Sequence, residues 1–219
     1  MKHSFDFALT TYCQAKCRSC ARTHDDTGEK QHWLPLQHMN LDQFRNTLES
    51  ANNKITYDMI EFCGEFGDPM MHPKVDNFIE TALNYAPLVE ISTNGGLRNS
   101  DWYASIGEKY KNKCRIWWAL DGATHDVNWL YREGVDFNKA IDNLTAFTKA
   151  GGWSTWMYLI FDWNWHQVAI AKQMADELGI AIIFRYNNRS HGLITDTNMK
   201  LSKEFNKQHD IKIGFEDDM

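Results

Sequence analysis

Three cysteines lie close together near the start of the chain, in the spacing Cys13-x3-Cys17-x2-Cys20. They follow a short stretch typical of a β-strand, and the carboxyl ends of strands carry the active sites of parallel α/β folds. Three thiolates on one loop can hold a single inorganic centre. Because a [4Fe–4S] cube normally takes four Cys ligands, three would leave one iron open for a substrate or cofactor.

Three other interpretations of these cysteines compete. Three buried structural cysteines are the least expected, because the same loop also carries Lys16 and Arg18. His24 follows Cys20 by four positions, so Cys13, Cys17, Cys20 and His24 could form a closed structural zinc site. Structural zinc more often stabilises small domains, and a chain of 219 residues can bury a core without it. A disulfide with a spare thiol is disfavoured, because the N-terminal residues show no export signal.

The composition is that of a packed globular domain and excludes several classes of protein. Apolar residues make up 43% of the chain and charged residues 24%, with a net charge of −6. An acidic balance argues against broad nonspecific binding of nucleic acid. The longest apolar runs, such as Trp156–Phe161, are much shorter than the roughly twenty residues of a membrane span. We therefore expect a cytoplasmic protein without membrane contact.

The rest of the chain alternates between strand-like and helix-like segments. Strands are expected at Ser4–Thr10, Thr56–Cys63, Leu88–Thr93, Arg115–Leu120, Ser154–Phe161 and Ala181–Tyr186. Helices are expected at Leu41–Asn52, Pro73–Tyr85, Asp101–Lys111, Phe137–Ala150, Gln167–Leu178 and Ser202–His209. Asn40 and Ser100 are candidate helix caps.

This alternation predicts a parallel sheet with right-handed crossovers in an α/β fold. A closed eight-unit barrel takes about 250 residues, so six units in 219 residues predict an open, partial (β/α)6 TIM-like barrel. No linker-like segment divides the chain, which predicts a single domain over residues 1–219. The barrel would cover about residues 4–190, and residues 191–219 would form a C-terminal extension.

The cysteine spacing after a first strand resembles the signature of radical S-adenosylmethionine (SAM) enzymes. Four later segments, each at the end of a strand or just beyond it, resemble the branch of that family that often carries a C-terminal auxiliary-cluster (SPASM) domain. They are Phe62-Cys63-Gly64-Glu65-Phe66-Gly67-Asp68-Pro69-Met70-Met71-His72-Pro73, Ile91-Ser92-Thr93-Asn94-Gly95, Ala119-Leu120-Asp121-Gly122-Ala123 and Tyr131-Arg132-Glu133-Gly134. The resemblance covers about residues 4–190.

The resemblance implies a partial (β/α)6 barrel, one [4Fe–4S] cluster held by Cys13, Cys17 and Cys20, and SAM on the open iron. An electron from the cluster would cleave SAM to a 5′-deoxyadenosyl radical, which abstracts a hydrogen atom from a substrate. Two features depart from the family pattern: Ser19 stands where an aromatic or large apolar residue is common, and Asp68 replaces the usual glutamate. No cysteine follows Cys114, so the chain resembles the catalytic core without ligands for auxiliary clusters.

The same motifs suggest which residues would contact SAM. Gly64 and Gly67 allow close backbone approach, and a carboxylate at Glu65 or Asp68 suits the SAM ammonium. Three short polar side chains, Ser92, Asn94 and Asp121, suit the ribose hydroxyls. Arg132 offers a fork that matches the SAM carboxylate. Each segment is also consistent with plain structure: a Gly/Pro-rich turn, Asp-Gly turn chemistry, or a helix-end arginine.

The expected function is hydrogen-atom abstraction from a peptide, protein or small molecule, with an electron donor such as flavodoxin or ferredoxin. The sequence identifies no general acid or base, so the catalytic residues stay unknown. Arg185–His191 and the pair Trp163 and Trp165 are candidate substrate contacts, with a solvated loop and a covered barrel edge as the plain alternatives. Two further alternatives are the zinc-stapled binding module and a relative of the fold that no longer cleaves SAM.

Overall fold

The computed structural model describes residues 3–52, 56–188 and 192–213. Six strands form one sheet: β1 (Ser4–Phe7), β2 (Met59–Phe62), β3 (Val89–Thr93), β4 (Cys114–Ala119), β5 (Trp153–Ile160) and β6 (Ala181–Tyr186). Their order in the sheet is β1-β2-β3-β4-β5-β6 and all neighbours are parallel. Within these residues β1 and β6 remain the two edges, so the sheet is an open, partial barrel, as the alternation of elements predicts.

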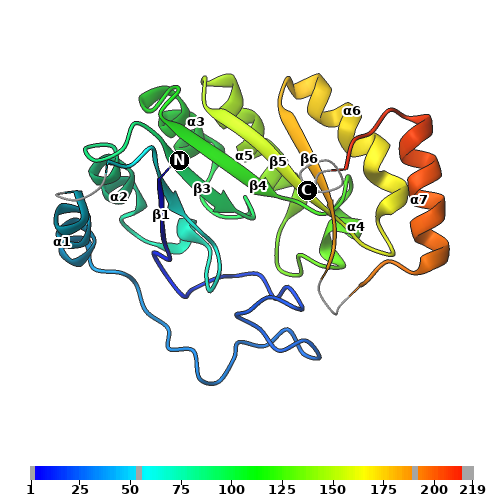
Figure 1. Ribbon diagram of the computed structural model, residues 1–219, viewed down its shortest axis with the longest axis horizontal. Helices are drawn as coiled ribbons and strands as arrows, with labels where there is room; N and C mark the ends of the chain where they lie inside the picture. Colours follow the sequence, from blue (N-terminus) through cyan, green and yellow to red (C-terminus); the bar gives the residue numbers. More distant parts are fainter. Residues whose placement is uncertain (1–2, 53–55, 189–191, 214–219) are drawn as a thin grey trace.

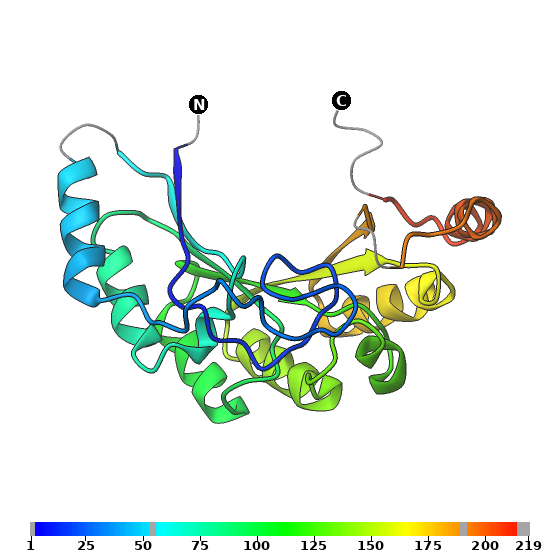
Figure 2. The same ribbon diagram turned by 90° about the horizontal axis from the view of Figure 1, so that it is seen from below.

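Helices cover one face of the curved sheet and leave the other open, as the two perpendicular ribbon views show (Figures 1 and 2). They are α1 (Leu41–Asn52), α2 (Val75–Ala82), α3 (Ser100–Lys109), α4 (His125–Trp129), α5 (Phe137–Lys149), α6 (Val168–Leu178) and α7 (Asp196–Gln208), with short 3₁₀ turns η1 (Pro69–Met71) and η2 (Trp165–Gln167). None of the described helices is long and apolar enough to cross a membrane.

Alternation along the strands divides buried side chains from partly exposed ones. In β4 the buried residues Cys114, Ile116 and Trp118 belong to the main core, while Arg115, Trp117 and Ala119 alternate with them and are partly exposed. Because successive side chains point to opposite faces of a strand, the second set lies on the face without helices. That open face, which we call the inner face, is where a ligand can reach the sheet.

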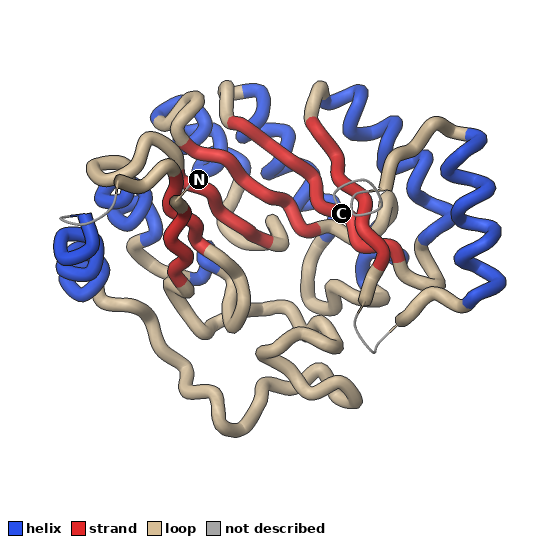
Figure 3. Tube along the Cα trace, viewed as in Figure 1, coloured by secondary structure: helices blue, strands red, loops and turns tan. Residues whose placement is uncertain are grey.

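The structure shortens the first expected strand. β1 ends at Phe7 and not at Thr10, because the chain beyond it turns to the segment before α1: Thr10 forms an antiparallel bridge with His38, and the amide of Met39 donates to the carbonyl of Leu9 at 2.8 Å. The long loop between β1 and α1 therefore starts early, and it runs below the lower ends of the strands in the view of Figure 3. This loop carries all three clustered cysteines.

Helix ends follow capping chemistry, with two corrections. Asn40 caps α1 through its Oδ1, which accepts the amide of Asp42 at 2.8 Å, as expected. Asn99 caps α3 in place of Ser100, with Oδ1 accepting from the amide of Trp102 at 3.0 Å. The C-terminal helix α7 begins six residues before Ser202, because Thr195 caps it and lies against Asp162.

Candidate functional site

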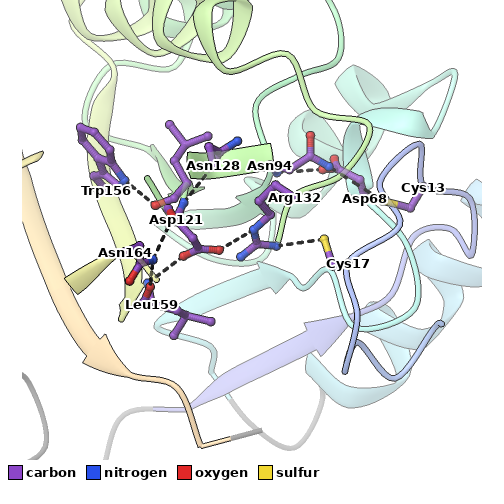
Figure 4. Close-up of polar contacts among 11 residues, drawn as sticks. Cys13, Cys17, Asp68, Asn94, Asp121, Asn128, Arg132, Trp156, Leu159 and Asn164 are labelled. Atoms are coloured by element: carbon purple, nitrogen blue, oxygen red, sulfur yellow. Dashed lines mark hydrogen bonds and ion pairs between the residues drawn. The ribbon is translucent and has the colours of Figure 1, made fainter. Parts of the chain in front are cut away.

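The three clustered cysteines line one cavity of about 150 Å³ at the carboxyl ends of β2, β3 and β4. Its walls also hold most of the residues that the strand-end motifs single out. Among the described residues, the lining consists of Cys13, Ala15, Cys17, Cys20, Arg22, Gly64, Gly67, Asp68, Ser92, Thr93, Asn94, Ala119 and Arg132. Segments that are more than a hundred residues apart in sequence therefore meet around the thiols, as part of the close-up shows (Figure 4).

Backbone hydrogen bonds hold the cysteine loop against the sheet from two sides. The amide of Asp68 donates to the carbonyl of Tyr12 at 2.9 Å, and the amide of Lys16 donates to the carbonyl of Glu133 at 2.8 Å. Within the loop itself, Nε of Arg22 donates to the carbonyl of Thr11 at 3.1 Å and so braces the loop internally. The loop is thereby fixed to the segments after β2 and α4 that complete the cavity.

All five cysteines are free thiols, and burial holds two of the clustered ones in the neutral form. Burial, followed by the charge of Asp68, raises the pKa of the Cys13 thiol to about 12. Burial also raises the pKa of Cys17, although Arg132 opposes the shift. Thiols in this setting ionise when a positive centre sits beside them, which is what a bound metal group supplies. The donor set fits an iron–sulfur cluster.

A single metal ion fits the same residues poorly. Within the described parts of the chain, no three His, Cys, Asp or Glu side chains converge as one ion requires. His24 is exposed, and its ring stacks on that of His32 with centroids 6.2 Å apart. In the described structure His24 is therefore not gathered with the three cysteines, while three thiolates on one loop are a donor set that an iron–sulfur cluster would take.

Asp68 joins the ends of β2 and β3. Its carboxylate is buried and accepts from the amide of Met70, the hydroxyl of Thr93 and the amide of Asn94, each at 2.9 Å. Burial raises the pKa of Asp68, and these donors oppose that rise. Gly67 is part of the same junction: a Cβ there would lie 2.3 Å from the carbonyl oxygen of Thr10.

Ser92, near the end of β3, and Asn94, directly after it, both line the cavity. Asn94 donates from Nδ2 toward the sulfur of Cys13 at 3.8 Å, and Ser92 is partly exposed in the lining. Glu65 is exposed and is not among the described residues that line the cavity. Only its carbonyl oxygen approaches the site, 3.9 Å from the sulfur of Cys20.

Asp121 lies behind the cavity and does not belong to the described lining. Its side chain is fully buried, with Oδ2 accepting from Nε of Arg132 at 2.6 Å and Oδ1 from the amide of Leu159 at 2.7 Å. Arg132 in turn extends from this carboxylate to the sulfur of Cys17, with Nη1 3.8 Å away (Figure 4). Burial disfavours the guanidinium charge, but Asp121 and Cys17 outweigh it and raise the pKa of Arg132.

Several residues of the site escape the sequence analysis. Gln14, between two of the cysteines, pairs with Asn94, and Thr93 binds Asp68. Asn164 contacts the carbonyl of Asp121 from η2's N-terminal side. Gln14 and Thr93 lie within the motifs described above, so their place in those motifs could have identified them. Asn164 lies in no such motif, and no nearby residue pattern points to it.

Of the candidate substrate contacts, Trp163 packs with the small apolar group around Cys17 and stacks on Phe161 at 4.9 Å, while Trp165 packs into the main core. Arg185 lines a second cavity. Arg189, Ser190 and His191 lie outside the described residues.

This second cavity, of about 260 Å³, occupies the inner face of the sheet. It is lined by Glu61, Glu90, Ser92, Trp117, Ala119, Met157 and Arg185. Ser92 and Ala119 also line the cysteine cavity, so the two spaces adjoin at the ends of β3 and β4. A molecule on the inner face would lie next to whatever the cysteine cavity holds.

No protein-family model and no curated protein matches the chain. Solved structures do match over nearly its whole length. SuiB of Streptococcus suis bound to S-adenosylmethionine aligns with a TM-score of 0.71 at 13% identity, covering 97% of this chain and 49% of SuiB. The native anSMEcpe with bound AdoMet aligns with a TM-score of 0.71 at 15% identity, covering 96% and 62%.

A radical SAM methyltransferase from Sphaerobacter thermophilus gives a TM-score of 0.64 at 12% identity, covering 97% of this chain and 65% of that one. The chain has the radical SAM core fold. The sequence resemblance is thus confirmed at the level of the fold. The chain spans about half to two thirds of the length of the structures it matches. Other matched structures are SuiB bound to the precursor peptide SuiA and anSMEcpe bound to AdoMet and the Kp18Cys peptide.

Proposed function

We propose that the protein is a radical SAM enzyme that binds one [4Fe–4S] cluster, cleaves SAM reductively and abstracts a hydrogen atom from a substrate. The observation that carries the proposal is the convergence of three free cysteines with the ends of β2 and β3 and with Arg132 around one cavity. The structural similarity to SAM-bound proteins, at low sequence identity, supports the proposal only through the shared fold. The proposed chemistry rests on the residues that line the cavity.

Each wall of the cavity has its own task in this proposal. Cys13, Cys17 and Cys20 hold the cluster, which when bound supplies the electron that breaks a carbon–sulfur bond of SAM. Gly64, Gly67 and the carboxylate of Asp68 bind the ammonium of SAM. Ser92 and Asn94 bind the ribose hydroxyls, and the free edge of Arg132 binds the carboxylate.

Glu65 and Asp121 take indirect parts, given where they lie. The carbonyl of Glu65 faces Cys20, so this residue would act through its backbone. Asp121 would act through Arg132, whose Nε it holds.

We further propose that the substrate binds on the inner face, in the cavity that adjoins the cysteines. A peptide or protein is the first candidate, since SuiB and anSMEcpe have been crystallised with peptides. A small molecule is the second, because the cavity is small and mixed in character. An electron donor such as flavodoxin or ferredoxin would reduce the cluster. Five unpaired cysteines suit a reducing compartment, so we place the protein in the cytoplasm.

The test is anaerobic purification and reconstitution with iron and sulfide. We expect absorption at about 400 nm, an EPR signal after reduction, and 5′-deoxyadenosine formed from SAM with dithionite as the reductant. A colourless protein with one tightly bound zinc would instead establish the zinc-stapled binding module. A cluster-loaded protein that forms no 5′-deoxyadenosine would establish a relative that no longer cleaves SAM.

A further inference from the structure

The buried pair of Asp121 and Arg132 holds the guanidinium in one orientation. The Asp121 carboxylate is fully buried and the Arg132 side chain is 16% exposed, and Nε and Oδ2 are 2.6 Å apart. A charge-assisted contact this short and this buried is much stronger than an ion pair on the surface. Arg132 therefore has little freedom to turn away from the cysteine loop.

A network of backbone and amide groups prevents Asp121 itself from rotating. Its Oδ1 accepts from the amide of Leu159, its amide donates to Oδ1 of Asn128, and its carbonyl accepts from Nδ2 of Asn164. Asn128 and Asn164 are fully buried. Figure 4 shows these residues grouped around Asp121, on the side away from the cysteines. The pair is thus anchored to the ends of β4 and β5.

The three cysteines differ in what faces their sulfur atoms. Cys17 lies 3.8 Å from Nη1 of Arg132, a cationic donor. Cys13 faces the neutral amide of Asn94, and Cys20 faces the carbonyl of Glu65. Among the side-chain hydrogen bonds of the described residues, Cys17 alone of the three has a cationic partner. This asymmetry is built into the fold.

We propose that Asp121 and Arg132 form a positioning unit that directs a charged hydrogen bond to Cys17 and raises the reduction potential of the cluster before SAM binds. Reduction adds a negative charge to a cluster, and hydrogen bonds to its sulfur ligands together with a nearby cation stabilise that reduced state. This inference rests on the proposed function, because it needs a cluster on the three cysteines. It also gives Arg132 a task that precedes its contact with the SAM carboxylate.

The test is a redox titration of the cluster-loaded protein without SAM, followed by EPR. In Arg132→Gln we expect the ratio of reduced to oxidised cluster at a fixed solution potential to fall at least tenfold, which is about 59 mV for a one-electron couple. Arg132→Lys keeps the positive charge but loses the planar guanidinium, so we expect a smaller fall in the ratio of reduced to oxidised cluster. Arg45→Gln is the matched control, since Arg45 pairs with Asp42 on the exposed face of α1 and its loss should leave the potential unchanged.

Asp121→Asn separates a positioning role from a direct charge effect. If Asp121 acts by holding Arg132, its removal frees the guanidinium and the potential falls. If its own negative charge acted on the cluster, the potential would rise, and the inference would be wrong.

The inference is also overturned if Arg132→Gln and Arg45→Gln show the same SAM-free potential and EPR spectrum. A change confined to SAM affinity would likewise overturn it, because Arg132 would then serve SAM alone. If Arg132→Gln does not load a cluster, Arg132→Lys and Asp121→Asn decide the question. Failure of the proposed function looks different: the wild-type protein itself would bind no cluster or cleave no SAM.

Discussion

Gln14 and Asn94 exchange two side-chain hydrogen bonds beside the cysteine cavity. Nε2 of Gln14 donates to Oδ1 of Asn94 at 2.6 Å, and Nδ2 of Asn94 donates back to Oε1 of Gln14 at 3.4 Å. The pair joins the cysteine loop to the end of β3, which lies eighty positions further along the chain. It places Asn94 beside Cys13 and so links a proposed cluster ligand to a proposed ribose contact.

Replacing Gln14 by alanine should loosen the cysteine loop. We expect a loss of about 1 kcal/mol in the free energy of unfolding, as for an ordinary hydrogen-bonded pair, and a clear fall in iron bound per chain after reconstitution. Urea denaturation and iron analysis measure the two effects. Gln43→Ala on the exposed face of α1 is the control. Equal iron content in the two variants would show that the amide pair does not position the cysteines.

Much of the fold follows from local sequence patterns, because strands and amphipathic helices are encoded by nearby residues. The bounds of α1 were predictable from its apolar spacing and from Asn40, and β6 from its run of branched and aromatic residues. The early end of β1 was not, because the partner of Thr10 is His38, far along the chain. Short α4 lacks the length that makes periodicity visible.

The site shows the same division between local and long-range information. Cysteine spacing and strand-end motifs are local, and they located the cavity. The orientation of Asp121 depends on Leu159, Asn164 and Arg132, which no local pattern pairs with it. Glu65 and Asp68 are three positions apart, and only the folded turn decides that Asp68 points inward.

Gly67→Ala should disturb the contact between the loop after β2 and the cysteine loop. The new Cβ would lie 2.3 Å from the carbonyl oxygen of Thr10 and 2.7 Å from that of Tyr12, so backbone must move. We expect a loss of about 1–3 kcal/mol in the free energy of unfolding, as in overpacked sites, together with reduced cluster loading.

Gly179→Ala is an informative control for this substitution. Gly179 has a φ of +67° after α6, with nothing within 4 Å of an added Cβ. Gly179→Ala should lower the free energy of unfolding by about 1 kcal/mol, because of the backbone conformation alone, and the variant should bind as much cluster as the wild type. If Gly67→Ala bound iron as well as Gly179→Ala, the close approach of the two loops would not matter for the site.

Single cysteine substitutions should separate cluster ligands from core residues. We expect Cys13→Ala, Cys17→Ala and Cys20→Ala each to lose the cluster, since each removes one of three ligands. Cys63→Ala should retain it, because Cys63 does not line the cavity in the described structure. Iron and sulfide per chain, with the absorption spectrum, measure the result.

His24→Ala adds a direct test of the zinc alternative. With His24 exposed and stacked on His32, its loss should leave metal content unchanged. Loss of bound metal in His24→Ala would favour the Cys3His site and contradict the arrangement of the cavity.

His72 should make stability depend on pH below neutrality. Its Nδ1 accepts from the amide of Lys74 at 3.1 Å, so the proton of the neutral ring sits on Nε2, which faces the carbonyl of Met39 at 3.1 Å. Burial lowers the pKa of His72, and the charges of His38, Arg98 and Lys74 act in the same direction. Protonation would therefore break the bond from Lys74 and place a cation among like charges.

The sign of this effect follows from the lowered pKa. The unfolded chain takes up a proton near the ordinary value of 6.5, while the folded chain resists until a lower pH. Stability is thus complete above 6.5 and falls as the pH drops through the interval between the two values, by at most about 1.4 kcal/mol per pH unit for one group. In His72→Gln this component is absent, so urea midpoints measured from pH 8 to pH 5 should converge with those of wild type as the pH falls. Parallel curves for the two proteins would show that His72 titrates alike in the folded and unfolded chain, and would contradict the lowered pKa.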